Sequence, residues 1–238
     1  MKLIDSRSEN EWSGALFEVA ESLGFSSVMY AALPSKHANL EHSFLQSNYS
    51  KDWRLRYVAD KLHYVDPTVQ HCMTSVLPLV WRPGAFSGSG QAALYEEASG
   101  HGIRSGITFP MHGCNGEAGL ISFASDMKPG PAFDDQLTHY MADLSLLRDY
   151  AFESSLPFMR ARSVAEHAPH LTRRELEVLN WVMAGKSSWE ISRITECAEA
   201  TVNFHISNIR QKFNVSTRQQ ALVKAIALGI INPEDPHR

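Results

Sequence analysis

The sequence contains few cysteines and no long apolar segment. Three of its 238 residues are cysteine, at positions 72, 114 and 197, and no two have the spacing of a metal site. We therefore expect no disulfide framework, no metal and a reducing compartment such as the cytoplasm. No apolar run approaches the ~20 residues that span a bilayer, and the N-terminus lacks the apolar core of a signal peptide. These absences indicate a cytoplasmic protein without a membrane partner, long enough for two domains.

Acidic residues are scarce in one part of the chain, although the formal net charge of the whole is −4. Residues 171–232 contain 8 Lys and Arg against 5 Asp and Glu, and no carboxylate follows Glu199 in the helix expected there. Because attraction to phosphates is local, this segment suits nucleic acid better than the total charge suggests. The excess is modest, so we expect dimers rather than monomers on DNA.

The helix expected over residues 199–213 has a helical repeat of apolar residues. Val202, Ile206, Ile209 and Phe213 fall at i, i+4, i+7 and i+11, while amides, hydroxyls and positive charges occupy the remaining surface. A second short helix is expected over 187–196, so the pair predicts a helix-turn-helix. A capping box begins an earlier helix, and a final helix follows the pair. In the short helix we expect these side chains to face inward: Trp189, Ile191 and Ile194.

The N-terminal part alternates between helical and strand patterns. Helices are expected at 10–23, 53–62, 66–72, 91–99 and 134–152, and strands at 27–33, 42–48, 77–81, 103–111 and 117–124. This order predicts an α+β fold: an α/β/α sandwich with one antiparallel sheet and helices on both faces, followed by an all-α four-helix domain. Residues 154–170 show little periodicity. We therefore predict domains at 1–155 and 171–238, joined by a linker at 156–170.

Two sets of motifs resemble one known family. The C-terminal set is similar to the LuxR-type helix-turn-helix, through Leu171-Thr172-Arg173-Arg174-Glu175, Gly185-Lys186 and Ala200-Thr201-Val202-Asn203-Phe204-His205. The N-terminal set resembles the autoinducer-binding domain of acyl-homoserine-lactone receptors, through Asn48-Tyr49, Trp53-Arg54, Tyr57, Val65-Asp66-Pro67-Thr68-Val69, Trp81 and Gly106-Ile107-Thr108. The LasR branch looks closest, through His71-Cys72, Ser75-Val76-Leu77-Pro78 and Ser188-Trp189-Glu190-Ile191-Ser192.

This resemblance implies roles for the N-terminal residues. An acyl-homoserine lactone needs donors for two carbonyls, an acceptor for its amide N–H and an apolar tunnel for its tail. The resemblance places Trp53 on the lactone carbonyl and Asp66 on the amide N–H. It places Tyr49 and Ser122 on the amide carbonyl, with Thr68 as support and Arg54 reaching a 3-oxo group through water. The expected walls are Tyr57, Val69, Trp81, Leu94, Ala98, Ile103, Thr108 and Leu120.

The resemblance also implies a DNA-binding surface. Asn203, Phe204 and Ser207 are the candidates for contact with base edges, since Asn pairs with adenine and Phe can touch a thymine methyl group. His205 is open between packing and DNA contact, and Phe204 between a base and another domain. The candidates for phosphate contact are Ser188, Thr201, Arg210, Gln211 and Lys212.

Several of these residues also have plainer interpretations. Trp53 and Trp81 suit an ordinary aromatic core, and Asp66 before Pro67 suits a helix N-cap. Tyr49 suits a strand end at the surface. The chain also departs from the LasR-like pattern. Residues 84–90 are richer in glycine, Phe86 replaces a tyrosine and Leu94 replaces an aromatic residue, so the tail preference is the open point.

We therefore predict a quorum-sensing transcriptional regulator, mainly an activator. It binds a long-chain, 3-oxo N-acyl-homoserine lactone, dimerises, and binds palindromic promoter DNA and RNA polymerase. Binding only to the folded form would stabilise the N-terminal domain. Alternatives are a receptor for another small molecule, a lactone hydrolase and a phosphorylated response regulator. The histidines form no metal-spaced set and no phosphoacceptor pattern is present, so we expect no catalytic residue and no cofactor.

Overall fold

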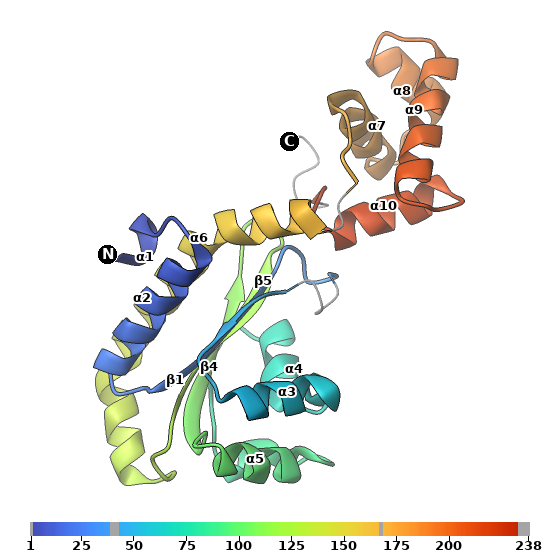
Figure 1. Ribbon diagram of the computed structural model, residues 1–238. Coiled ribbons are helices and arrows are strands. Elements are labelled where there is room, and N and C mark those ends of the chain that lie inside the picture. The colour runs from blue at the N-terminus through green and yellow to red at the C-terminus, as the bar shows by residue number, and fades with distance from the viewer. Residues whose placement is uncertain (1, 39–42, 167–168, 233–238) are drawn as a thin grey trace. The chain divides into compact units, whose positions relative to one another are not determined.

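The computed structural model describes residues 2–38, 43–166 and 169–232 (Figure 1). Its contacts group the chain into two compact units. One, the sheet unit, comprises residues 1–32, 43–112 and 118–159, and the other, the helical unit, comprises 33–42, 113–117 and 160–238. None of the helices in the described ranges has the length and apolar character that crossing a membrane requires.

The sheet unit is built on a five-stranded sheet. Its strands are β1 (Ser27–Leu33), β2 (Phe44–Ser47), β3 (Leu79–Val80), β4 (Ser105–His112) and β5 (Ala118–Ser125), in the spatial order β2-β1-β5-β4-β3. The β1–β2, β3–β4 and β4–β5 pairs are antiparallel, as expected. β1 and β5 approach closely at Gly119, because a Cβ there would collide with the carbonyl oxygen of Ala31. Any larger residue at 119 would therefore push these two strands apart.

One face of the sheet carries the main apolar core. The long helices α2 (Glu9–Ser22) and α6 (Pro131–Glu166) cover it, and the short α1 (Lys2–Asp5) precedes them (Figure 1). Along β4 and β5, every second side chain points into this core, because strand side chains alternate between faces. The fully buried members include Trp12, Leu16, Ile107, Ile121, Phe123 and Leu144.

Shorter helices cover the opposite face. They are α3 (Lys51–Ala59), α4 (Pro67–Thr74) and α5 (Gln91–Gly100), with single 3₁₀ turns η2 (Leu62–Tyr64) and η3 (Pro83–Phe86) between them (Figure 1). Ser50 and Asp66 cap α3 and α4 with their side chains, and Pro67 takes the first position of α4. Layers of helices on both faces confirm the predicted sandwich.

The helical unit contains four short helices: α7 (Arg173–Met183), α8 (Ser188–Ile194), α9 (Glu199–Lys212) and α10 (Arg218–Ala227). Capping boxes begin α7, α8 and α10, which explains why these short segments start where they do. The predicted stripe of α9 faces the core of this unit, with Val202, Ile209 and Phe213 buried and Ile206 partly buried. The predicted helix-turn-helix is therefore confirmed.

Two details of the sequence-based description were wrong. Trp189 and Ile194 are 57% and 42% exposed, and only Ile191 of the three faces inward. Positions 189 and 191 are two apart, and residues at that spacing do not share a helix face.

Helix α6 also continues beyond its predicted end at Phe152 to Glu166, so residues 156–166 of the predicted linker are helical. A buried stripe continues through Leu147, Ala151, Ser155 and Met159. The polar Ser155, bonded to the Tyr30 hydroxyl at 2.6 Å, hid this period in the sequence. The domain boundaries themselves stay a prediction.

Candidate functional site

A second apolar cluster in the sheet unit brings together many of the predicted ligand residues. We call it the aromatic cluster. It is a minor core, separate from the one under α2 and α6, and is rich in aromatic side chains. Its buried members are Tyr49, Trp53, Trp81, Phe86, Leu94, Ala98, Ile103 and Ala124, with Met29, Tyr57, Leu62, Val65, Ala85 and Tyr95 partly buried around them.

Asp66 lies next to this cluster as a buried carboxylate. It is 8% exposed, and its Oδ1 accepts from the backbone N–H and the hydroxyl of Thr68 at 2.8 and 2.7 Å. Its Oδ2 accepts from the Tyr57 hydroxyl at 2.8 Å. The N-cap interpretation of Asp66 is therefore correct, but the cap is also buried and bonded to Tyr57. A carboxylate held by neutral donors in this way can accept a further N–H from a ligand.

Tyr49 carries the most informative polar atom of the site. Its hydroxyl is buried and has no hydrogen-bond partner among the described residues. Burial, together with the negative charge of Asp66, raises the pKa of Tyr49 well above its ordinary value, so the hydroxyl keeps its proton. A buried donor without an acceptor costs about 1–3 kcal/mol. A carbonyl oxygen placed here would remove that cost.

Three further polar groups form a chain at the sheet. The indole N–H of Trp81 donates to the Thr108 hydroxyl at 2.9 Å, and the hydroxyls of Thr108 and Ser122 lie 2.8 Å apart. When the Thr108 hydroxyl donates its hydrogen bond to Ser122, the Ser122 hydroxyl is left to donate its own to a ligand carbonyl. Gly106 allows this arrangement, because a Cβ there would lie 2.7 Å from the Trp81 ring.

The remaining predicted ligand residues have varied environments. Leu120 is buried on the same strand face as Ser122, and Val69 on α4 is partly buried. Arg54 is exposed on α3, outside the cluster, so a direct contact is not supported for it. Thr108 is fully buried, and its hydroxyl is hydrogen-bonded to Trp81 and Ser122, so its side chain is not the purely apolar wall that was expected.

Sequence reasoning also missed residues in the cluster and beside it. Phe86, which in the sequence stands out only as a departure from the LasR-like pattern, is buried and packs against Tyr95 with ring centroids 4.9 Å apart. His101 lies against Trp53, with ring centroids 5.4 Å apart. Ala124 could have been found from its position two residues after Ser122, on the same strand face. No comparable signal marked His101.

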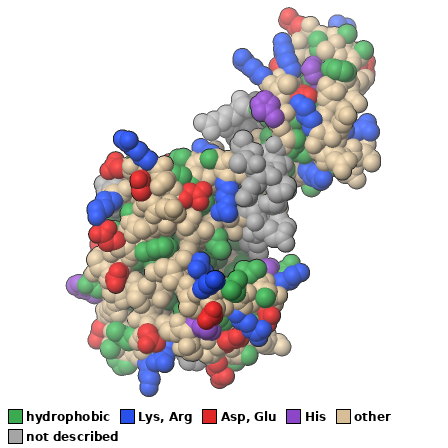
Figure 2. Space-filling model, in the orientation of Figure 1, with side chains coloured by type: hydrophobic (Ala, Val, Ile, Leu, Met, Phe, Trp, Pro, Cys, Tyr) green, Lys and Arg blue, Asp and Glu red, His purple; other side chains and the backbone are tan. Residues whose placement is uncertain are grey.

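The exposed arc of α9 contains most of the predicted DNA residues. Thr201, Asn203, Phe204, Ser207, Arg210 and Gln211 are exposed, and Lys and Arg side chains project from the face of the helical unit in Figure 2. Phe204 is 61% exposed and its ring lies 5.8 Å from that of the partly buried His205. Ser188, at the start of α8, is partly buried. The arc offers amides, hydroxyls, an aromatic ring and positive charge together, a combination suited to a DNA groove.

Lys212 differs from the other candidates for phosphate contact. Its ammonium donates to Glu175 Oε2 at 2.6 Å and to the carbonyl of His170 at 2.8 Å. Burial acts to raise the pKa of Glu175, but hydrogen bonds from Lys212 and Thr172 outweigh it and the pKa is lowered. Lys212 therefore joins the end of α9 to the start of α7.

Within residues 2–38, 43–166 and 169–232, no group of three or more His, Cys, Asp or Glu side chains is placed to hold a metal ion.

Family comparisons cover most of the chain. Residues 8–155 match the family described as autoinducer binding domain, and residues 169–225 match the family described as bacterial regulatory proteins, luxR family. The transcriptional activator AnoR of Acinetobacter nosocomialis is 31% identical over 91% of this chain and 92% of its own. The transcriptional activator LuxR of Aliivibrio fischeri is 30% identical over 97% of this chain and 92% of its own.

Solved structures share the fold. Escherichia coli SdiA is 25% identical, covers 97% of this chain and 94% of its own, and gives a TM-score of 0.74. A structure of SdiA in complex with octanoyl-rac-glycerol is also 25% identical, covers 97% and 92%, and gives a TM-score of 0.77.

Proposed function

The chain belongs to the autoinducer-binding LuxR family of transcriptional regulators, and from this we propose that its aromatic cluster binds an N-acyl-homoserine lactone. The family consists of regulators rather than enzymes, so the lactone hydrolase alternative is set aside. The predicted class, an autoinducer-binding transcriptional activator with a helix-turn-helix, is confirmed. The ligand, the branch within the family and the residue roles below are our proposal.

The buried hydroxyl of Tyr49, which has no partner in the described part of the chain, supports this proposal most directly. A ligand amide fits the polar groups here: Tyr49 and Ser122 donate to its carbonyl, and Asp66 accepts its N–H. Thr68 holds the Asp66 carboxylate in place. We assign the indole N–H of Trp53 to the lactone carbonyl. One neutral ligand thereby meets a charged acceptor and several donors in a buried site, which favours an amide over a plain fatty acid.

The apolar part of the cluster supports a long acyl tail. Trp81, Leu94, Ala98 and Ile103 are buried there, with Tyr57 and Val69 partly buried and Leu120 nearby. We propose a chain of roughly ten to twelve carbons and a place in the LasR branch, on the motifs that resemble it. A 3-oxo group would reach the exposed Arg54 only through water. Binding assays with a chain-length series test this, and a preference for four to six carbons contradicts it.

The decisive experiment identifies the ligand by mass. The full-length protein is expressed in the presence of a mixture of lactones of different chain length and is then purified. The bound small molecule is extracted, and its mass is measured by mass spectrometry. We expect one long-chain lactone in the wild type and little or none in a Tyr49→Phe, Asp66→Ala double variant. An extract without lactone, from well-folded protein, contradicts the proposed ligand.

A different small molecule is the second candidate, favoured by the SdiA structure with octanoyl-rac-glycerol. An acylglycerol has an acyl carbonyl for Tyr49, but it lacks the amide N–H and would give Asp66 a hydroxyl instead. Competition separates the two: unlabelled octanoyl-rac-glycerol displaces a bound lactone at low concentration only if the site prefers the glycerol ester.

For the helical unit, we propose that α9 enters the major groove of promoter DNA. Asn203, Phe204 and Ser207 meet base edges, and Thr201, Ser188, Arg210 and Gln211 meet phosphates. Lys212 is engaged with Glu175, so we propose a structural role for it in place of the predicted phosphate contact. We propose that the protein acts in the cytoplasm as a dimer, which places two such helices on a palindromic DNA site. Activation would then proceed through contact with RNA polymerase. Footprinting and in vitro transcription test these steps.

A further inference from the structure

Helix α3 is weakly anchored for a wall of the site. Trp53 is its one buried residue, whereas Leu55 and Val58 are 60% and 67% exposed. Segments with few buried apolar contacts open at lower free energy than the core of a domain. Among the helices around the aromatic cluster, α3 is therefore the one we expect to move most readily.

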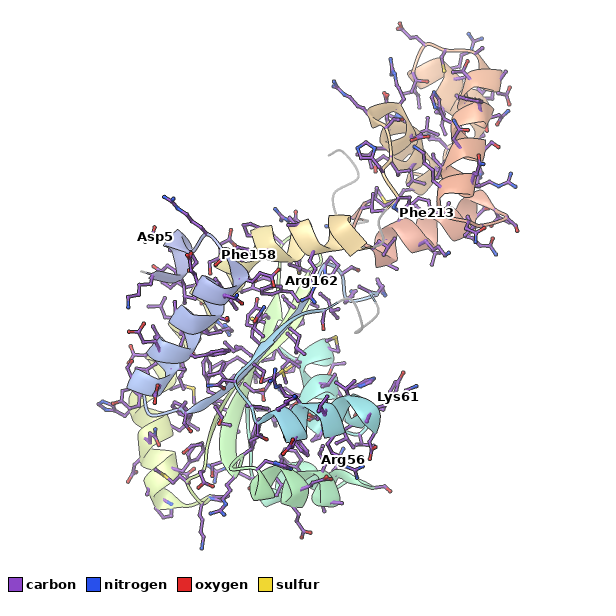
Figure 3. All side chains as sticks on the ribbon, viewed as in Figure 1. Asp5, Arg56, Lys61, Phe158, Arg162 and Phe213 are labelled. Carbon is purple, nitrogen blue, oxygen red and sulfur yellow. The ribbon has the colours of Figure 1, made fainter. Side chains whose placement is uncertain are left out.

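Two side chains at the C-terminal end of α5 contact α3 and its N-cap. Glu97 lies in the last turn of α5 and His101 is the C-cap that follows the helix, and each makes a polar contact there. Arg56, labelled in Figure 3, extends from α3 to Glu97, with its Nε 2.9 Å from Glu97 Oε1. His101 contacts the other end of α3: its Nδ1 lies 3.3 Å from Ser50 Oγ, and its ring lies 5.4 Å from that of Trp53.

The His101 contacts bear directly on the polar end of the site. Ser50 Oγ caps α3 by accepting the backbone N–H of Trp53 at 3.3 Å, so its own hydrogen is available for His101. Trp53 lies edge-on to Tyr57 with ring centroids 5.9 Å apart, and Tyr57 donates to Asp66. An unbroken series of contacts therefore joins an exposed histidine to the buried carboxylate.

We propose that Glu97 and His101 form a latch that closes α3 over the site and sets how fast a bound ligand leaves. The ligand part of this idea rests on the function proposed above. Both are positioning residues: they act on the ligand through α3 and Trp53. Trp53 must shift for the site to open on this side, and each latch contact adds to the barrier for that shift.

The test measures release of a labelled ligand. Full-length protein is loaded with tritiated N-(3-oxododecanoyl)-homoserine lactone and chased with excess unlabelled lactone. We expect release about two- to tenfold faster in His101→Ala, the range given by loss of one ring contact. In Glu97→Gln the increase is smaller and disappears at high salt, because that ion pair is exposed and screened. The control is His139→Ala, an exposed histidine on α6 that also lies against an aromatic ring, Tyr140 at 4.6 Å.

Conservative variants separate the latch from general loss of packing. His101→Phe keeps the ring over Trp53, and His101→Asn keeps an acceptor for Ser50. Each should restore part of the slow release, and the control should release at the wild-type rate. Wild-type release in both His101→Ala and Glu97→Gln overturns the latch.

Hydrogen exchange gives a readout that does not depend on the identity of the ligand. On the protein as purified, amides 51–59 should exchange faster in His101→Ala than in wild type, while those of β4 and β5 are unchanged. If the lactone does not bind at all, the proposed function fails, but exchange still tests the latch. Unchanged exchange over 51–59 overturns it in that case too.

Discussion

The Lys212 ammonium is expected to stabilise the helical unit rather than to bind DNA, and Lys212→Ala tests this. The substitution removes two charge-assisted hydrogen bonds, to Glu175 Oε2 at 2.6 Å and to the His170 carbonyl at 2.8 Å. The Glu175 side chain is only 3% exposed, so its carboxylate would keep the capping bonds but lose its cation. Hydrogen bonds to charged groups contribute about 1.5–3 kcal/mol. Lys212 is one-third exposed, so we expect a loss of about 2 kcal/mol.

The effect should appear in the stability of α7 and α9. In a unit of this size, about 2 kcal/mol corresponds to a melting temperature lower by roughly 10 °C. Hydrogen exchange of the full-length protein should show faster exchange in both helices. The control is Lys186→Ala, because the Lys186–Glu190 pair is exposed on both sides and should change nothing measurable.

Acid should have the same effect as the substitution. The pKa of Glu175 is lowered in the folded protein, so its contribution is complete above the unfolded value and is lost as pH falls through the lowered folded value. The wild-type helical unit should therefore lose stability below about pH 4.5, and this loss should be smaller in Lys212→Ala.

DNA binding distinguishes the structural role from phosphate contact. A lysine on a phosphate contributes about 0.9 to the slope of log K against log salt. We expect that slope to be unchanged in Lys212→Ala and reduced by this amount in Arg210→Ala, whose side chain is exposed. A Lys212→Ala protein of wild-type stability with a reduced slope would refute the structural role.

Three further predictions concern the ligand site. Tyr49→Phe removes the buried hydroxyl that has no partner among the described residues, so calorimetry should find the ligand-free protein as stable as wild type or more stable, by at most about 3 kcal/mol. Ligand titration of the same variant should show a lactone affinity at least fivefold lower. Asp66→Ala or Trp53→Ala should abolish lactone-dependent transcription from a reporter promoter, and a normal response in either variant would contradict the assigned roles. Gly106→Ala brings a methyl group to within 2.7 Å of the Trp81 ring, so thermal unfolding should show a destabilised sheet unit that excess lactone only partly restores.

Local sequence determined most of the secondary structure. Apolar spacing located α2, α9 and the pair β4–β5, because one face of each must be buried. Capping residues such as Thr172 and Asp66 located helix starts, because the first turn of any helix needs acceptors for its free N–H groups. Motifs identified the family and the residue types of the site. They did so because donors, acceptor and apolar wall must all be present in the chain whatever its fold.

Tertiary structure decided which of these groups meet. Ser122 and Trp81 join through Thr108 only because β4 and β5 pair in one register. Two interactions were not predictable from spacing: Lys212 bonds to Glu175, 37 positions away, and the ring of His101, just after α5, lies against Trp53. The predicted burial of Trp189 was wrong for the same reason, because a short helix has one inner face and tertiary packing decides which face that is. A side chain's partner depends on distances through space, and these are set by how whole helices and strands pack.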